Sequence, residues 1–368
     1  MRRERKLHKG KAKQLNDSER KTTIYDIAEE AKISASTVSL VLNGRWKKYR
    51  ISKKTAERVL ALAKAKGFTV NLGARGLRLS RSGLCGMIVP HYRNRFFASL
   101  AEAFEAQSRA RGLCPVIVSA HREDETEREA AATLISHQVE FLFVAGVRDP
   151  TAINQLCEDA NIRSINVDLP GTHAPSAISD NREAARQLTN SLLDTLGPEK
   201  ALDFQFYGGH AEDNSTVERI DGVRQAYMAR GLEVPDSAYL PCGYSPPEIA
   251  EAIFGHLEKR KEANPPSAVF ANGITALEGM LILRNTRGVD LLSDTFIGCY
   301  DWDPFAANLR HDISFVRQDV EGLVSAGFEL LDETKKGEYP TIRVPAELRL
   351  SAAALARKND VSTTTGNQ

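Results

Sequence analysis

The strongest constraint on the fold is an alternation of short, β-rich apolar runs with longer amphipathic segments between residues 84 and 317. Amphipathic helices are expected between the runs, for example over residues 97–111, 182–195 and 218–230. This alternation is typical of βαβ units, in which a parallel sheet is covered by helices on both faces. The segment is longer than one doubly wound sheet usually needs, so two lobes with a cleft are expected. The expected strands cover residues 84–90, 115–120, 141–146, 164–168, 201–207, 267–271, 295–300 and 313–317.

Residues 22–67 have a different pattern, in which apolar residues recur at helical spacing and β-rich runs are missing. Thr22 or Thr23 can cap a first helix, Ser34 a second and Ser52 a third, and Gly67 ends the third helix. Three short helices joined by a tight turn predict a helix-turn-helix module.

Charge is distributed very unevenly along the 368 residues, although the net charge is only +1. Residues 1–81 hold 22 basic and 7 acidic side chains, which gives a net charge of +15. Residues 82–368 hold 27 basic and 41 acidic side chains, which gives a net charge of −14. So basic a module, joined to an acidic body, points to a polyanionic partner. The alternative interpretation is a basic tail that only improves solubility.

The segment that joins the module to the body reads NLGARGLRLSR (residues 71–81) and holds three Arg, three Leu and two Gly residues. It is too basic for a core element and too apolar for a plain linker. Because Gly73 and Gly76 each cost about 1 kcal/mol in a helix relative to Ala, we expect this segment to be helical only when it is bound to the polyanionic partner.

The stretch TTIYDIAEEAKISASTVSLVLNG (residues 22–44) resembles the DNA-binding domain of the LacI/GalR family of bacterial transcriptional regulators. The chain departs from the family pattern at Lys32, usually Gly, at Leu40, usually Arg, and at Val70, usually Pro. The matching residues are Thr23, Asp26, Ile27, Ala28, Ala31, Ser34, Thr37, Val38, Ser39, Leu42 and Asn43, followed by Phe68, Asn71, Ala74, Arg75 and Leu77.

The resemblance covers roughly residues 22–355 and implies an N-terminal all-α helix-turn-helix domain plus an α/β, two-lobed effector domain like the type I periplasmic binding proteins. The polar ends, residues 1–21 and 356–368, are expected to be disordered. The implied parts are a helix-turn-helix domain at 22–70, a hinge at 71–82 and an effector-binding and dimerisation domain at 83–355. Its first lobe is expected at about 83–180 and 318–339, and its second lobe at about 181–317 and 340–355.

For DNA, the resemblance implies a recognition helix that starts near Ser34 and enters the major groove. Ala35 and Leu40 can touch a thymine methyl group, but no Arg, Asn or Gln is placed for a bidentate base contact, so the helix should read bases weakly. The loop with Lys47 and Lys48 should hold phosphates, or else form a solvated surface. The candidate DNA contacts are Thr23, Tyr25, Ser34, Ala35, Ser36, Thr37, Ser39, Leu40, Asn43, Arg45, Arg50, Asn71, Ala74, Arg75 and Leu77, with Leu77 expected to wedge between base steps in the minor groove.

For the effector, the resemblance implies a cleft that binds a sugar or a sugar derivative. The polar candidates lie just past strand ends or at a helix start, where α/β clefts bind ligands. Carboxylates, amides and an Arg can bridge neighbouring hydroxyls, and two aromatic side chains can cover an apolar sugar face. Each residue also has a plain structural interpretation, such as a surface salt bridge or a turn. The candidates are Phe96, Asp168, Arg219, Asn272, Asp301, Trp302 and Gln318.

The sequence therefore predicts a cytoplasmic, homodimeric regulator, with repression the favoured mode, that binds a pseudo-palindromic operator in double-stranded DNA. We expect no membrane contact, cofactor, metal or catalytic residue, because no signal peptide, metal-binding spacing or GxSxG, GxGxxG or HExxH motif is found. The five scattered cysteines suggest reduced thiols. Two alternatives remain at this point: a sugar-binding transport component, and a cytosolic α/β enzyme with a fused DNA-binding domain.

Overall fold

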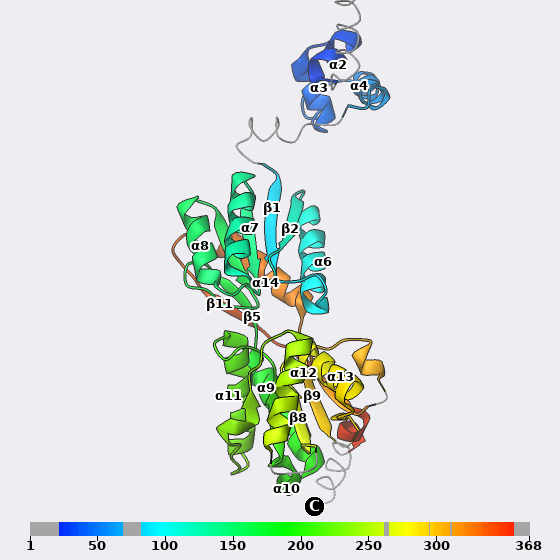
Figure 1. Ribbon diagram of the computed structural model, residues 1–368. Coiled ribbons are helices and arrows are strands. Elements are labelled where there is room, and N and C mark those ends of the chain that lie inside the picture. The colour runs from blue at the N-terminus through cyan, green and yellow to red at the C-terminus, as the bar shows by residue number, and fades with distance from the viewer. Residues whose placement is uncertain (1–21, 69–81, 261–264, 294, 310, 357–368) are drawn as a thin grey trace, which may run out of the picture. The chain divides into compact units, whose positions relative to one another are not determined.

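The computed structural model describes residues 22–68, 82–260, 265–293, 295–309 and 311–356 (Figure 1). The chain divides into two units, residues 1–82 and 83–368. The predictions for the two ends of the chain and for the hinge at 71–81 lie outside the described residues.

The first unit holds three helices, α2 (Ile24–Ala31), α3 (Ala35–Leu42) and α4 (Lys53–Ala65). Each begins after the hydroxyl residue expected to cap it. The Thr23, Ser34 and Ser52 hydroxyls accept hydrogen bonds from backbone N–H groups in the first turn. Ile27, Val38 and Val59 are fully buried and pack the three helices together. The three helices surround one small core, as a helix-turn-helix module does.

Lys32 explains why the family usually has Gly in this turn. It ends α2 with φ 53° and ψ 45°, in the left-handed region, and its N–H bonds the carbonyls of Ala28 and Glu29. This conformation suits Gly, because a Cβ atom makes it unfavourable. The chain therefore keeps the tight turn but accepts local strain.

The first lobe of the second unit is a six-stranded, all-parallel sheet with the order β11-β5-β4-β3-β1-β2. Helices α6 (Arg95–Ala110) and α14 (Val320–Glu333) cover one face, and α7 (Asp124–Ser136) and α8 (Pro150–Asp159) cover the other. The strands are β1 (Leu84–Val89), β2 (Cys114–Ser119), β3 (Phe141–Ala145), β4 (Arg163–Val167), β5 (Ser176–Ser179) and β11 (Thr341–Val344).

The second lobe is a similar sheet with the order β12-β10-β9-β8-β6-β7, in which only β12 runs antiparallel to its neighbour. Helices α9 (Asn181–Leu196) and α11 (Asn214–Met228) cover one face, and α12 (Pro246–Lys259) and α13 (Ile274–Arg287) cover the other. The strands are β6 (Phe204–Tyr207), β7 (Tyr239–Leu240), β8 (Ala268–Ala271), β9 (Phe296–Tyr300), β10 (Ile313–Arg317) and β12 (Glu347–Arg349). The short helical elements are α10 (Pro198–Ala201) and two 3-10 turns, Asp236–Ala238 and Ala306–Asn308.

All eight expected strands are present, with ends shifted by up to three residues, but one predicted lobe boundary is wrong. Residues from 340 onward were expected in the second lobe, whereas β11 pairs in parallel with β5 of the first lobe. The chain therefore crosses between the lobes after Val344. Four short strands, β5, β7, β11 and β12, were not expected; β11 reads TIRV, lies at a sheet edge and is mostly unburied, so its pattern is weak.

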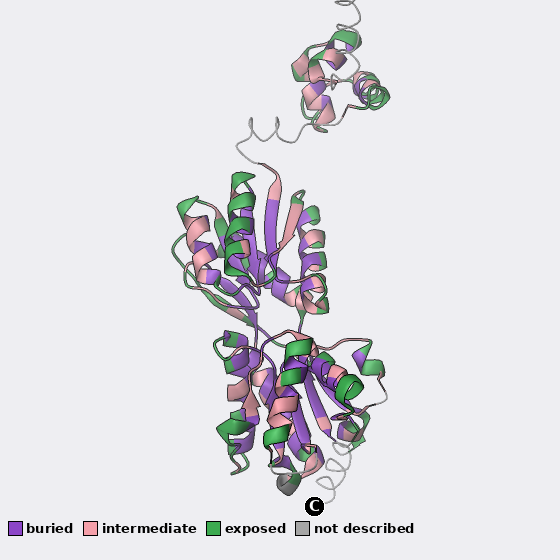
Figure 2. Ribbon diagram, viewed as in Figure 1, coloured by how far each residue is buried: buried purple, intermediate pink, exposed green. Residues whose placement is uncertain are grey.

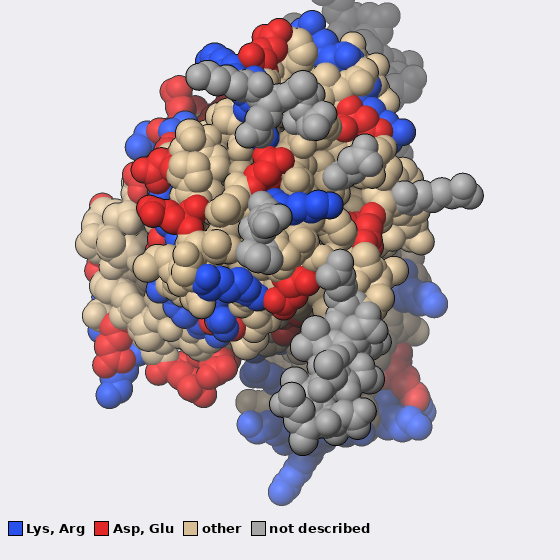
Figure 3. Space-filling view, turned by 90° about the horizontal axis from the view of Figure 1, so that it is seen from below, with Lys and Arg blue, Asp and Glu red and all other residues tan. Residues whose placement is uncertain are grey.

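Burial follows this layered arrangement: the central strands of both sheets are buried, and the outer helix faces are exposed (Figure 2). On the face of the second lobe in Figure 3, basic and acidic side chains are intermixed and no large region has a single sign. In the part of the chain that the structure describes, no helix is both long and apolar enough to cross a membrane.

Candidate functional site

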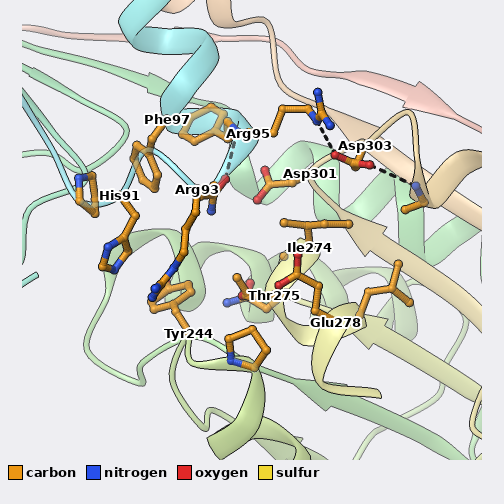
Figure 4. A pocket seen from close by; sticks show the side chains of 18 of the residues that line it. His91, Arg93, Arg95, Phe97, Tyr244, Ile274, Thr275, Glu278, Asp301 and Asp303 are labelled. Atoms are coloured by element: carbon orange, nitrogen blue, oxygen red, sulfur yellow. Dashed lines mark hydrogen bonds and ion pairs between the residues drawn. The ribbon is translucent and has the colours of Figure 1, made fainter. Parts of the chain in front are cut away.

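A pocket of about 440 Å³ lies between the two lobes, where the carboxyl ends of both parallel sheets face each other (Figure 4). Parallel α/β sheets commonly bind ligands at this edge, because the loops after the strands and the starts of the following helices converge there. Six of the seven effector candidates line the pocket: Phe96, Asp168, Arg219, Asn272, Asp301 and Gln318.

Two aspartates occupy equivalent places in the two lobes. Asp168 directly follows β4 and Asp301 directly follows β9, and both are left-handed, with φ 75° and 71°. Asp residues tolerate this conformation better than most, and at these two turns it aims a carboxyl group into the pocket. The side chain of Asp168 is 6% exposed and makes no hydrogen bond or ion pair with any residue that the structure describes. Its carboxyl group therefore faces the pocket with acceptor positions that no described side chain occupies, while the charges of Arg219 and Arg122 act on it from nearby.

Burial raises the pKa of both carboxyl groups. The pKa of Asp168 rises to about 6 because burial and the charges of Asp301 and Asp213 outweigh the opposing charges of Arg219 and Arg122. The pKa of Asp301 also rises through burial, against Arg219 and the hydrogen bond from Gln318.

Arg219 is the buried cation between these acids, with 4% of its surface exposed. Its Nε donates to Asn181 Oδ1 at 2.9 Å and one terminal nitrogen donates to the Asn272 carbonyl at 2.5 Å. The guanidinium lies 3.5 Å from the ring centroid of Tyr300. These contacts fix the guanidinium plane, so that its charge faces the pocket without occupying it.

Two amide side chains are fixed by hydrogen bonds around the same pocket. Asn272 donates to Thr216 Oγ1 at 3.0 Å and to the carbonyl of Gly208 at 3.3 Å. Gln318 donates to Asp301 Oδ1 at 2.5 Å and accepts from the Ser179 hydroxyl. Because Gln318 belongs to the segment that re-enters the first lobe, this bond links the two lobes beside the pocket.

The two aromatic candidates lie at different positions relative to the pocket. Phe96 is half-buried, lines the pocket and packs edge-on against Phe97, with ring centroids 5.0 Å apart. Trp302 does not line this pocket but lines a neighbouring groove that shares Phe96, Asp301 and Gln318 with it, so its contact with a ligand stays a prediction. Its ring lies between Arg317 and Arg349, whose guanidinium carbons are 5.4 and 5.0 Å from its centroid.

The sequence analysis missed a second polar group in the site, formed by Arg122, Asp213 and Tyr244. Arg122 pairs with Asp213 at 3.1 Å across the lobes and lies 4.3 Å from the Tyr244 ring centroid, and the Tyr244 hydroxyl donates to Asp213 at 2.7 Å. A usable signal existed, since Arg122 and Asp213 each follow an expected strand and so belong to the same sheet edges.

The raised pKa of Asp168 predicts a pH-dependent stability. The carboxyl group of Asp168 has an ordinary pKa of 3.8, which applies to the unfolded chain, and a pKa of about 6 in the folded chain. At pH values between 3.8 and about 6, the folded chain therefore binds more protons than the unfolded chain. The free energy of unfolding should therefore fall as pH rises from about 4 to about 6 and stay constant above. Asp168→Asn should remove this slope and raise the free energy of unfolding at neutral pH by on the order of 2 kcal/mol in urea titrations. An unchanged slope in the variant would contradict the assignment.

The DNA candidates on the helical unit fall into two groups. Several are used inside the unit: the Thr23 and Asp26 side chains bond each other, Ser34 bonds Thr37, and the Asn43 amide donates to the Ser39 carbonyl at 2.7 Å.

The second group is free to reach a partner. Tyr25 is 71% exposed, and Ser36, Arg45 and Arg50 are exposed as well. Ala35, Ser39 and Leu40 do not belong to this free group, because all three are half-buried, Ala35 packs against the core of the unit and the Ser39 hydroxyl accepts from the Asn43 amide at 3.3 Å. Asn71, Ala74, Arg75 and Leu77 lie outside the residues that the structure describes.

Comparisons with known proteins agree with this division into two units. Residues 23–71 match the family model "Bacterial regulatory proteins, lacI family", and residues 82–295 match "Periplasmic binding proteins and sugar binding domain of LacI family".

Two curated relatives are operon repressors. The ribitol operon repressor of Klebsiella aerogenes is 46% identical over 174 residues, which are 47% of this chain and 64% of that protein. The sucrose operon repressor of Klebsiella pneumoniae is 29% identical over 322 residues, which are 87% of this chain and 94% of that protein.

The fold is similar to that of a crystal structure of the lac repressor dimer bound to operator and the anti-inducer ONPF. The TM-score is 0.75 at 19% identity, over 91% of this chain and 99% of that chain. The two family models together match residues 23–71 and 82–295, and the two relatives named above are operon repressors. The chain is therefore a DNA-binding transcriptional regulator that responds to a small ligand, and it belongs to the LacI family of bacterial regulatory proteins.

Proposed function

We propose that this regulator is a cytoplasmic, homodimeric repressor of an operon for sugar or polyol use, and that a polyhydroxylated ligand in the interlobe pocket controls its affinity for the operator. The ribitol and sucrose operon repressors among its relatives support this ligand class. One recognition helix that makes few base contacts is not specific alone. When a dimer links two such helices, binding of the first helix to its half-site raises the effective concentration of the second helix at the other half-site.

The observation that carries the ligand class is the unpartnered carboxyl group of Asp168. With Asp301, Asn272 and Gln318 it presents acceptors and amides from both lobes to one cavity. A chain of neighbouring hydroxyl groups can donate to these acceptors and accept from Arg219. A ligand bound in this way contacts both lobes at once and so favours one relative orientation of the lobes.

The lobes are also joined by three ion pairs in which the first lobe supplies the arginine and the second lobe the carboxylate. Arg95 pairs with Asp303 at 2.5 Å, and Arg343 makes a bidentate pair with the buried Glu218 at 2.6 and 2.9 Å. The third is the Arg122–Asp213 pair beside Tyr244. All three must break or rearrange when the lobes separate, so ligand binding and lobe orientation are coupled.

A calorimetric screen of pentoses, pentitols, hexoses and sucrose tests the ligand class. One of them should bind to the wild-type chain and bind at least tenfold more weakly to Asp168→Asn, since a charge-assisted hydrogen bond contributes about 1.5–3 kcal/mol. If every compound fails to bind, the proposed ligand class is wrong. DNA selected from a random pool at fixed salt should contain a pseudo-palindromic site.

The exposed loop after α3 provides a separate prediction about DNA. Arg45, Lys47, Lys48 and Arg50 are all exposed in it, and we propose that they contact phosphates. Arg45→Gln should weaken binding to all sequences alike and lower the slope of log affinity against log salt by about 1. Fluorescence anisotropy at several salt concentrations measures this slope. Arg128→Gln, which removes an exposed charge from the first lobe, is the control and should leave the slope unchanged.

A further inference from the structure

Four nitrogen-rich side chains of the first lobe gather at one side of the pocket. His91 and Arg93 follow β1, and His121 and Arg122 follow β2. The Nδ1 atoms of the two histidines are 3.2 Å apart, and their ring centroids are 5.3 Å apart. His91, Arg93 and Arg122 line the pocket itself. We call these four residues the basic rim.

The backbone that carries half of the basic rim is strained. His121 and Arg122 are consecutive non-glycine residues in the left-handed region, with φ 56° and 58°. The His121 N–H bonds the Pro90 carbonyl at 2.9 Å, and this bond ties the turn to the loop after β1. Two such residues in a row are costly, and strain of this kind is typical of sites that bind ligands. The turn directs Arg122 toward the second lobe, where it meets Asp213.

The positive charge of the basic rim is only partly neutralised. Asp213 pairs with Arg122, but Arg93 forms no hydrogen bond or ion pair with any described residue. Burial, together with the positive charges of Arg93, His121 and Arg122, lowers the pKa of His91. In Figure 4 the Arg93 side chain extends across the cavity toward the side where Tyr244 and Thr275 lie. Arg93 is exposed at the wall of the pocket, so its guanidinium is open to an anionic group of a bound ligand.

The opposite wall of the pocket is also suited to a negative group. Helix α13 starts there, and its cap residue, Gly273, provides no side chain to bond the first N–H groups. The positive end of the helix dipole therefore faces the pocket, beside Asp301, whose carboxyl oxygen would lie 3.3 Å from a Cβ atom at Gly273. Glu278 lies one turn further along α13. Burial and the negative charge of Asp303 raise the pKa of Glu278, and the positive charge of Arg93 opposes this rise. Glu278 and Arg93 form no ion pair in the structure.

From the proximity of the unpaired Arg93, the rest of the basic rim and the uncapped start of α13, we infer that the effector is an anionic polyol. Its phosphate monoester or carboxylate group lies between Arg93 and Thr275, while its hydroxyl groups lie toward Asp168 and Asp301. This inference rests on the proposed polyol-binding function and adds the charge of the ligand. Arg93 is the residue that selects the charged form over the neutral form.

The test compares matched ligands by calorimetry on the full-length chain: ribitol and ribitol 5-phosphate, D-ribose and D-ribose 5-phosphate, and D-ribonate as the carboxylate. The anionic member of a pair should bind at least tenfold more tightly than the neutral member at low salt, and the difference should shrink at high salt. Arg93→Gln should remove this preference and leave the neutral ligand's affinity within about twofold. Arg128→Gln removes the same charge from an exposed helix position and should change neither affinity.

The outcomes separate the inference from the function on which it rests. If neutral polyols bind as tightly as the anionic ones, or if Arg93→Gln keeps the preference, the anionic class is wrong while the polyol pocket stands. If neither kind of ligand binds, the polyol function itself fails, and the inference fails with it. If D-ribonate shows the preference and the phosphates do not, the anionic group is a carboxylate.

Discussion

Arg219→Gln is expected to destabilise the effector domain by about 3–5 kcal/mol and to abolish ligand binding, because it removes the counter-charge of two buried acids. Arg219 is 4% exposed and its charge opposes the raised pKa values of Asp168 and Asp301. Without it both pKa values should rise further, so that both groups lose the ionised form that accepts hydroxyl hydrogen bonds. Urea unfolding measures the first effect, and calorimetry with the ligand found in the screen measures the second.

Arg219→Lys separates charge from geometry in the same experiment. Lys keeps the positive charge but cannot bond Asn181 and Asn272 together while lying flat against Tyr300. It should regain part of the lost stability and little of the ligand affinity. Wild-type affinity in the Gln variant would show that Arg219 is only a structural residue.

Gly222→Ala is expected to destabilise the chain by about 3 kcal/mol and to weaken ligand binding, although Gly222 does not line the pocket. A Cβ atom there would lie 2.2 Å from the Arg182 carbonyl oxygen and 2.9 Å from the Arg186 nitrogen, both backbone atoms of α9. Helix α11 would have to move away from α9, and Arg219, one turn earlier on α11, would lose its bond to Asn181 at the start of α9. The close approach of α9 and α11 explains why a residue without a side chain stands at position 222.

Gly255→Ala is the matched control for this effect. Gly255 lies inside α12 and a Cβ atom there meets nothing within 4 Å. Ala at such a position should be neutral or should stabilise the chain by up to about 1 kcal/mol. Equal destabilisation by both variants would contradict the account, because Ala is the better helix former and Gly255 has no close contact to lose.

The parts of the fold that could be predicted are those with strong local patterns. The caps at Thr23, Ser34 and Ser52 and the eight apolar runs have signals within a few residues. Asp168 and Asp301 were implied by the family resemblance, and their places after two strands agree with the rule that parallel sheets bind ligands at their carboxyl ends. What could not be predicted depends on pairing between distant segments. Strand β11 belongs to the first lobe because its backbone pairs in parallel with the edge of β5, which lies far away in the sequence.

The positions of Trp302 and Arg122 in the site also depend on structure that the local sequence pattern does not show. Trp302 follows Asp301 directly, but the left-handed turn at Asp301 is followed by a bond from the Trp302 N–H to the Val316 carbonyl, and the indole lies between two arginines outside the pocket. Arg122 enters the pocket through two left-handed residues that propensity would not favour. In both cases a backbone turn decides where the side chain points.

The central claim is that the ligand in the interlobe pocket changes operator affinity, and one titration tests it directly. The selected operator, fluorescently labelled, is titrated with the chain at fixed salt, with and without a saturating concentration of the ligand found by calorimetry. The account predicts that the ligand shifts operator affinity of the wild-type chain by at least fivefold, while Asp168→Asn, which keeps its operator affinity without ligand, needs at least ten times the ligand concentration to reach half of its shift. A wild-type chain that binds the ligand and yet holds the operator with unchanged affinity would contradict it.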